Sequence, residues 1–363
     1  MVMKRIANKN ILSVKPYVPG KPIEEVKREL GLKNVIKLAS NENPYGPSAR
    51  VLTAIRQAAR QVNRYPDGAC YYLGQELAKK LGVSQSQLIF GNGSDEILVL
   101  AVRAFVSPGE EVVVARPSFL VYDIASRLAG AKVKAVPLEG FRYNLPAMKK
   151  AVGKKTKIVF IGNPDNPAGT YVTRDEVQKF FKGLRQDVVV IFDEAYFEYI
   201  DSKDYPDTLN LLKKHKNIIV TRTFSKMYAL AGLRIGYGIA DPEIISLLNR
   251  LREPFNVNSV AQAAALAALK DSRYYRKLAG KFKQQREYLY KNLARVGLRY
   301  QKSAANFILV DVKKDSTQVA KQLLKKGVIV RDMSFWKLKG FIRITVGTQQ
   351  ENKKLISTLE EVI

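Results

Sequence analysis

The sequence predicts an α/β protein with two parts: a large domain built on a mostly parallel sheet covered by helices, and a small α+β domain formed by the two chain ends. Short apolar runs rich in β-branched residues alternate with helical stretches in the centre of the chain, which is typical of a parallel sheet buried on both faces. After residue 270 the pattern changes to a long polar helix followed by separate strands and helices.

The individual elements follow from the spacing of the apolar residues. Spacings of three and four residues predict helices over 47–62 and 72–81. Short apolar runs predict the strands of the large domain, at 87–90, 111–115, 132–136, 157–161, 187–192 and 217–221. In the final part we expect a helix over 271–293, a strand over 306–312, a helix over 317–326, strands over 328–330 and 341–346, and a closing helix.

The charge is strongly basic and unevenly distributed. The 363 residues include 61 Lys and Arg against 33 Asp and Glu, a formal net charge of +28. Residues 1–40 hold 9 basic and 3 acidic side chains, and residues 270–363 hold 22 and 8, whereas the centre holds 30 and 22. We therefore expect an N-terminal arm (1–40) that packs with the small domain (270–363), on either side of the large domain (41–269).

Composition also limits the function classes. A surplus of +28 suggests nucleic-acid binding, but the basic residues are interspersed and no motif of that class occurs. Apolar runs fall short of the 18–20 residues of a membrane span, and no secretory signal pattern is seen, so we expect a cytoplasmic protein. The single cysteine, Cys70, excludes an internal disulfide. The single histidine, His215, lies among lysines, and we expect no metal site.

Polar clusters follow four of the predicted strands, at 91–96, 162–169, 193–196 and 223–226. Ligands of open α/β sheets bind outside the carboxyl ends of the strands. Ser94 and Asp95 begin a helix whose N–H groups favour an anion, although Gly-Asn-Gly-Ser is equally good turn chemistry. Thr223, Ser225 and Arg234 add two hydroxyls and a guanidinium, so together these residues describe a phosphate site.

The same clusters hold groups for a ring and an aldehyde. Lys226 follows a strand, where a desolvated amine can form a Schiff base with a carbonyl, although a single lysine is usually a surface charge. Asp193 ends an apolar strand, and a buried carboxylate needs a partner such as a protonated ring nitrogen. Tyr196 and Asn166 offer donors to a phenolate oxygen. A lysine for an aldehyde, a carboxylate for a ring nitrogen, donors for a phenolate and a phosphate site are the four requirements of pyridoxal 5'-phosphate (PLP).

With these motifs the sequence resembles the fold-type I PLP-dependent aminotransferases, and within them the histidinol-phosphate aminotransferase family. The matching stretches are 41–47, 64–67, 91–96, 163–169, 193–196, 223–238 and 341–347. They occur in the family's order from Tyr17 to Gly347 and so cover nearly the whole chain. Each motif is modestly specific, but their joint order is highly specific.

The resemblance implies a role for each site residue. Lys226 is the Schiff-base lysine and the acid/base that moves the substrate's Cα proton, and Asp193 keeps the pyridine nitrogen protonated. The resemblance also implies that Tyr122 stacks on the ring and that Tyr65 reaches the neighbouring subunit's site, hence a homodimer. The expected cofactor set is Ser94, Asp95, Tyr122, Asn166, Asp193, Tyr196, Thr223, Ser225, Lys226, Arg234 and Tyr65.

The resemblance further implies small anionic substrates, an amino-acid phosphate and 2-oxoglutarate. Arg343 is expected to take a carboxylate in a two-pronged pair, and Arg331 and Tyr17 to meet the substrate phosphate. The expected substrate set is Tyr17, Asn43, Tyr65, Arg331 and Arg343. Two positions depart from the family pattern: Asp165 replaces a common Asn, and Ala168 replaces a more usual Thr. The segment 333–337 varies within the family.

The expected reaction is transfer of the amino group of L-histidinol phosphate to 2-oxoglutarate, giving imidazole-acetol phosphate and L-glutamate. Two alternatives share the fold: an aromatic amino acid aminotransferase and a threonine-phosphate decarboxylase. The stretches 225–234 and 343–347 favour the transaminase. A nucleic-acid-binding or scaffold protein with a PLP-like fold is a further alternative, supported only by the net charge.

Overall fold

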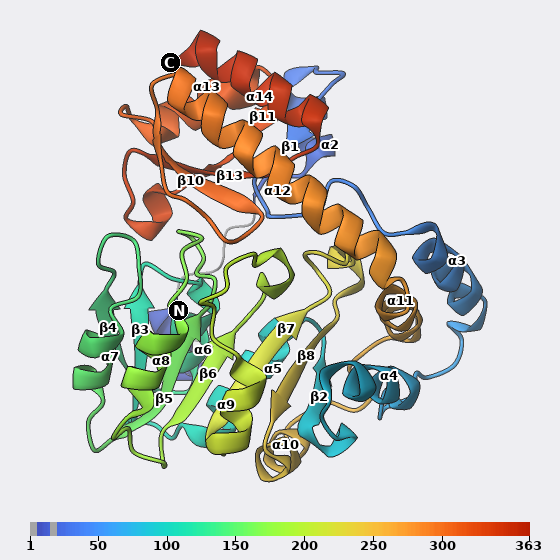
Figure 1. Cartoon of the computed structure of the whole chain (residues 1–363), viewed down its shortest axis with the longest axis vertical. Coiled ribbons are helices and arrows are strands. Elements are labelled where there is room, and N and C mark those ends of the chain that lie inside the picture. The colour runs from blue at the N-terminus through green and yellow to red at the C-terminus, as the bar shows by residue number, and fades with distance from the viewer. Residues whose placement is uncertain (1–5, 15–19) are drawn as a thin grey trace.

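The computed structural model describes residues 6–14 and 20–363, and it has a large lower lobe and a smaller upper lobe (Figure 1). The large lobe contains a seven-stranded sheet in the order β2-β8-β7-β6-β5-β3-β4. All six strands predicted for this sheet are present, and the predicted α/β class is confirmed. The strands are β2 (Leu88–Gly91), β3 (Glu111–Arg116), β4 (Lys132–Pro137), β5 (Thr156–Gly162), β6 (Val189–Asp193), β7 (Ile218–Thr223) and β8 (Gly236–Ala240).

The seventh strand, β8, was not predicted, and it is the one that runs antiparallel to both of its neighbours, β2 and β7. Its Gly-Tyr-Gly start is unlike a strand because glycine weakens strand interiors. Close packing explains the first glycine: a Cβ at Gly236 would lie 2.3 Å from the backbone nitrogen of Ser94. Gly236 therefore lets β8 pass directly beside the start of the helix α5 (Ser94–Phe105).

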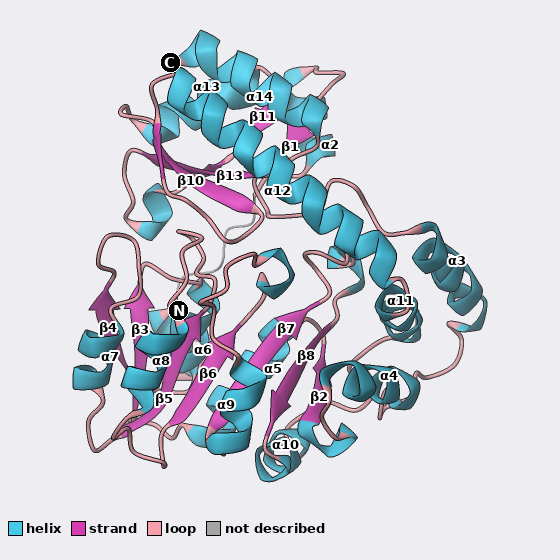
Figure 2. Cartoon of the chain, viewed as in Figure 1, coloured by secondary structure: helices cyan, strands magenta, loops and turns pink. Residues whose placement is uncertain are grey.

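Helices cover both faces of the sheet (Figure 2). One face packs on α5, α6 and α10, and the other packs on α7 and α8. The side chains of a strand alternate between the two apolar layers: Val159 and Ile161 of β5 lie in one layer, and Ile158 and Phe160 lie in the other. Burial on both faces is the reason that the central strands are continuous apolar runs, whereas the edge strand β4 is partly exposed. The helices of this lobe are α3 (Ala49–Ala58), α4 (Tyr71–Leu81), α5 (Ser94–Phe105), α6 (Leu120–Leu128), α7 (Leu145–Ala151), α8 (Arg174–Phe181), α9 (Thr208–Lys214), α10 (Pro242–Asn249) and α11 (Ser259–Leu269).

The small lobe combines both ends of the chain. Its four-stranded sheet has the order β12-β13-β10-β9, and β1 from the N-terminal part pairs in parallel with β11. This pairing supports the predicted packing of the N-terminal arm, although the boundaries at 40 and 269 stay predictions. The elements are α2 (Ile23–Leu30), β1 (Ile36–Lys37), α12 (Ser272–Arg295), β9 (Arg299–Tyr300), β10 (Phe307–Asp311), α13 (Ser316–Lys325), β11 (Val328–Ile329), β12 (Arg331–Asp332), β13 (Phe341–Thr345) and α14 (Gln349–Val362).

Among the helices of residues 6–14 and 20–363, none has both the length and the apolar character needed to cross a membrane.

Candidate active site

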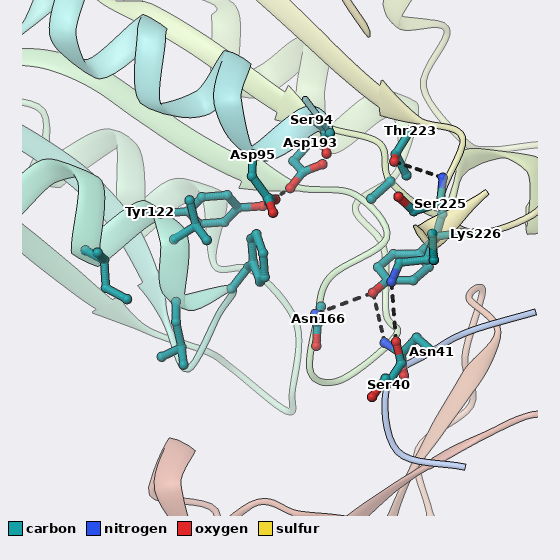
Figure 3. A pocket seen from close by; sticks show the side chains of 18 of the residues that line it. Ser40, Asn41, Ser94, Asp95, Tyr122, Asn166, Asp193, Thr223, Ser225 and Lys226 are labelled. Atoms are coloured by element: carbon teal, nitrogen blue, oxygen red, sulfur yellow. Dashed lines mark hydrogen bonds between the residues drawn. The ribbon is translucent and has the colours of Figure 1, made fainter. Parts of the chain in front are cut away.

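A cavity of about 960 Å³ lies at the carboxyl edge of the large sheet, where the two lobes meet. Its wall combines the loops that follow β2, β5, β6 and β7 with the 39–42 segment and with β12 and β13 of the small lobe. The polar clusters predicted at four strand ends therefore converge on one cavity, as the strand order requires. Figure 3 draws 18 of the lining side chains and labels ten of them.

One end of the cavity is the first turn of α5. Ser94 and Asp95 form this turn, and Gly93 precedes it with a φ of +82°, a conformation that favours glycine. A Cβ at Gly93 would lie 2.6 Å from Nη2 of Arg234, so the glycine allows the guanidinium to approach the helix start. The first backbone N–H groups of a helix have no partner within the helix, and here they face the cavity.

The loop after β7 completes this end. Arg234 donates from Nη1 to the Ser225 hydroxyl at 3.4 Å, and Nη2 lies 3.6 Å from Oδ2 of Asp95. The Ser225 backbone N–H donates to Oγ1 of Thr223 at 3.1 Å. Helix N–H groups, two hydroxyls and a guanidinium are the donors of a phosphate site. The predicted phosphate residues are thus brought together.

Asp193 lies deeper in the cavity, at the end of β6, and is 6% exposed. Its carboxylate accepts hydrogen bonds from the Tyr122 hydroxyl at 2.7 Å and from the Thr221 hydroxyl at 3.3 Å. Burial raises the pKa of Asp193 to about 6, against the opposing effect of the Tyr122 hydrogen bond. A carboxylate in this environment gains from a cationic partner such as a protonated ring nitrogen.

Lys226 follows β7 and points its amine into the cavity (Figure 3). Its Nζ lies 3.5 Å from the Ser40 carbonyl oxygen and 5.8 Å from the centre of the Tyr196 ring. Burial, and then the positive charge of Arg343, lower the pKa of Lys226 to about 8. About one tenth of the amine is therefore neutral at pH 7, far more than for an ordinary lysine, and only the neutral amine can attack an aldehyde.

A hydrogen-bonded network of side chains connects Tyr196, beside Lys226, with Arg343 of the small lobe. The Tyr196 hydroxyl accepts from Nδ2 of Asn41 at 2.9 Å and from Nδ2 of Asn166 at 3.4 Å. Burial raises the pKa of Tyr196 to about 12, so it is a neutral donor. Oδ1 of Asn166 in turn accepts from Nη1 of Arg343. Asn166 thus fixes the orientation of both the phenol and the guanidinium.

Two arginines of the small lobe face the cavity. Arg331 of β12 and Arg343 of β13 are directly opposite each other in the antiparallel register, and both line the cavity. Arg343 is 6% exposed and also donates from Nη2 to the Ala39 carbonyl at 3.0 Å. Like charges opposite each other on neighbouring strands repel, and an anion bound between them offsets this repulsion.

Two expected residues differ from their predicted roles. Tyr122 is 2% exposed, with its ring stacked on Phe160 at 4.6 Å. Phe160 covers one face of the Tyr122 ring, and the Tyr122 hydroxyl donates to Asp193. The structure therefore favours a role for Tyr122 in positioning the Asp193 carboxylate over stacking on a cofactor ring. Asn43 does not line the cavity, since its Nδ2 donates to the Met227 carbonyl at 2.8 Å. It holds the chain beside Lys226.

Of the remaining two expected residues, Tyr65 does not line the cavity. Tyr65 is 83% exposed and stacks on Phe255 at 4.8 Å, so it is available to another molecule. Tyr17 lies outside the described residues.

Sequence reasoning missed several residues of the cavity wall, among them Asn41, Phe119 and Trp336. Asn41 belongs to a quoted motif, and its φ of +55° and its amide bond to Tyr196 distinguish it from Asn43. Phe119, three residues before Tyr122, is half-buried and lines the cavity. Trp336 also lines it, and its position in a family-variable segment gave no signal.

Comparisons with known proteins agree with this geometry. Residues 33–359 match the family described as Aminotransferase class I and II. A curated histidinol-phosphate aminotransferase from Moorella thermoacetica is 49% identical, covering 97% of this chain and 92% of that protein. One from Caldicellulosiruptor saccharolyticus is 47% identical, covering 97% and 99%.

Solved structures give the same result. The histidinol-phosphate aminotransferase of Sinorhizobium meliloti, in complex with pyridoxal-5'-phosphate, matches with a TM-score of 0.90 and 32% identity, covering 98% of this chain and 97% of that chain. An aspartate aminotransferase from Thermus thermophilus, solved with maleate, matches with a TM-score of 0.85 over 98% and 99% of the two chains. At 22% identity this second likeness shows the fold alone.

Proposed function

Because the chain belongs to the class I and II aminotransferases, and within them to the histidinol-phosphate aminotransferases, we propose that it transfers the amino group of L-histidinol phosphate to 2-oxoglutarate. The products are imidazole-acetol phosphate and L-glutamate, and the reaction is a step of histidine biosynthesis. The observation that carries this substrate assignment is the pair of opposed arginines, Arg331 and Arg343, in the wall that also presents Lys226.

The residues present fit PLP. The start of α5 with Gly93 and Arg234 forms a cradle that a single Cβ would obstruct, and it suits the phosphate. Buried Asp193 suits the pyridine nitrogen, and the Lys226 amine suits the aldehyde. When bound, PLP supplies the aldehyde that bonds to amines and a protonated ring that takes up the electron pair left on the substrate's Cα.

The chain's own residues then handle protons and orientation. Asp193 holds the proton on the ring nitrogen, and Tyr122 and Thr221 fix the carboxylate in place. Lys226 would take the proton from the substrate's Cα and deliver it to the cofactor's C4′, for which a pKa of about 8 is well matched to neutral pH. Phe119 lines the cavity, and its ring would pack against the bound cofactor.

The residues nearer the small lobe would hold the ring hydroxyl and the substrate anions. Tyr196 and Asn166 would hydrogen-bond the ring hydroxyl, and their existing contacts orient them for it. Arg343 takes the carboxylate of glutamate or 2-oxoglutarate in a bidentate pair. The phosphate of histidinol phosphate takes the place of that carboxylate and, being larger, reaches Arg331 as well.

We further propose a homodimer in the cytoplasm. The exposed Tyr65 and Phe255 rings stack on each other, and exposed aromatic pairs of this kind are typical of interfaces. Tyr65 then contributes to the partner subunit's cavity. The single cysteine, Cys70, is buried, which is compatible with a reducing compartment. Sedimentation velocity tests the dimer directly, and a monomer that is active at all concentrations contradicts it.

A substrate panel tests the activity. The holoenzyme is given 2-oxoglutarate with histidinol phosphate, phenylalanine or threonine phosphate, and both glutamate and carbon dioxide are measured. We expect the highest kcat/KM for glutamate formation with histidinol phosphate. A preference for phenylalanine would identify an aromatic aminotransferase instead. Carbon dioxide released from threonine phosphate without glutamate would identify a decarboxylase.

A further inference from the structure

Trp336 lies against the arginine that faces the cavity from β12. Its ring centre is 4.9 Å from Cζ of Arg331, a cation–π distance, and both side chains line the cavity. Gly20 lies near the same guanidinium, since a Cβ there would be 3.5 Å from Nη1 of Arg331. The guanidinium is thus bordered by an indole ring and by the backbone of the N-terminal arm.

The turn that carries Trp336 is itself firmly held. The turn is the 3₁₀ helix η6 (Ser334–Trp336), and the Asp332 carboxylate before it accepts from the Ser334 backbone N–H at 3.1 Å and from the Thr317 hydroxyl at 2.8 Å. The Ser316 hydroxyl donates to the same carboxylate at 2.9 Å. A carboxylate with several donors anchors its loop.

Apolar packing holds the indole from the other side. Trp336 packs against a small cluster whose buried members are Ala168, Leu309 and Met333. Ala168 stands where the resemblance leads us to expect Thr, and it is completely buried. A methyl side chain at this position contributes only apolar surface to the cluster, whereas a threonine would also bring a hydroxyl to be satisfied. The departure at Ala168 therefore fits an apolar seat for Trp336.

We propose that Trp336 is a positioning residue that fixes the Arg331 guanidinium toward the cavity and thereby makes the arginine pair selective for a phosphate over a carboxylate. The inference rests on the proposed function. A carboxylate is satisfied by one bidentate guanidinium, here Arg343. A phosphate has three acceptor oxygens and gains from a second guanidinium. Losing the orientation of Arg331 therefore weakens phosphate binding more than carboxylate binding.

The test compares two half-reactions of the holoenzyme, followed by the cofactor's absorbance: amino transfer from histidinol phosphate and amino transfer from glutamate. The variants are Trp336→Leu, which keeps apolar bulk without a π face, and Trp336→Phe, which restores a ring. Phe335→Leu is the control for packing within the turn: Phe335 is 51% exposed and does not line the cavity, but its ring contacts the Trp336 ring edge-on at 5.5 Å between ring centres. It therefore removes a neighbour of the indole without removing the π face next to Arg331.

For Trp336→Leu we expect about a tenfold lower kcat/KM for histidinol phosphate, mainly through KM, and less than about a twofold change for glutamate. Trp336→Phe recovers most of the loss, and Phe335→Leu changes neither reaction. Equal losses for both donors, or no loss for either, overturn the inference while leaving the proposed function intact.

If the wild-type enzyme does not accept histidinol phosphate, the proposed function fails, and the inference is then judged with inorganic phosphate as a competitive inhibitor of the glutamate reaction. Trp336→Leu should raise its inhibition constant by about tenfold. An unchanged inhibition constant overturns the inference.

Discussion

Asp165 offers a quantitative test of how the loop beside the cavity is built. This carboxyl is 1% exposed, and its Oδ2 accepts from the Ala168 backbone N–H at 3.2 Å. Burial raises the pKa of Asp165 from its ordinary value of 3.8 to about 7, against the opposing hydrogen bonds. Ionisable groups of several elements face it: Tyr143, Tyr122 and Arg343, the last of which favours the ionised form. Asparagine, which the resemblance makes common at this position, has the same shape without the charge.

The raised pKa means that the folded protein binds a proton that the unfolded chain has lost. Stability conferred by wild-type Asp165 is therefore greatest at acidic pH and is lost as the pH rises from about 4 through about 7. Each tenfold change in the ionisation constant is worth about 1.4 kcal/mol, so ionising Asp165 costs the fold about 4 kcal/mol at pH 8. At pH 5 the same reasoning gives about 2 kcal/mol.

We therefore expect Asp165→Asn to stabilise the protein more at pH 8 than at pH 5, with a difference of about 2 kcal/mol between the two pH values. Urea unfolding followed by far-ultraviolet circular dichroism measures the free energy of unfolding of both proteins. Ala168 keeps its hydrogen-bond acceptor in the variant, so the pH-dependent part isolates the charge. A stabilisation that is the same at both pH values would refute the reasoning.

Three further predictions concern the cofactor and the charge. Asp193→Asn should lower the rate of both half-reactions by at least about 100-fold, because an amide cannot keep the ring nitrogen protonated. Stopped-flow absorbance measures these rates, and rates within a few-fold of wild type would contradict the role of Asp193. Gly93→Ala should weaken PLP affinity, measured by titrating PLP into the apoenzyme, by about tenfold or more, because the new Cβ would combine a positive φ with a contact on Arg234. Gly280→Ala is the control: Gly280 is exposed in α12, a Cβ there would have no atom within 4 Å, and its affinity for PLP should be unchanged. Added salt should lower kcat/KM but not kcat if the net charge of +28 attracts anionic substrates, and indifference of both constants would show that the charge has no such role.

Much of the fold was predictable because it depends on local patterns. Except for the partly exposed edge strand β4, the six parallel strands are buried apolar runs, and their carboxyl ends bring the polar clusters together by topology alone. The strand β8 was missed because Gly236 reflects a close approach to Ser94. That approach joins residues distant in sequence, and no local pattern records it.

The site was predictable to the extent that residues follow strands directly. Lys226 and Asp193 are in this class. The role of Tyr122 depended on its packing, because a second buried aromatic residue, Phe160, covers one face of its ring. The distinction between Asn41 and Asn43 depended on a backbone conformation, and the pairing of Arg331 with Arg343 depended on strand register. These are tertiary facts that spacing in the sequence does not encode.

We propose that this cavity transfers an amino group by way of a cofactor bound to Lys226. The most direct test mixes the holoenzyme with histidinol phosphate alone and records its absorbance spectrum. We predict loss of the aldehyde-form band and its return when 2-oxoglutarate is added, with neither change in Lys226→Ala. A spectrum that does not respond to histidinol phosphate, or that does not recover with 2-oxoglutarate, would contradict the claim.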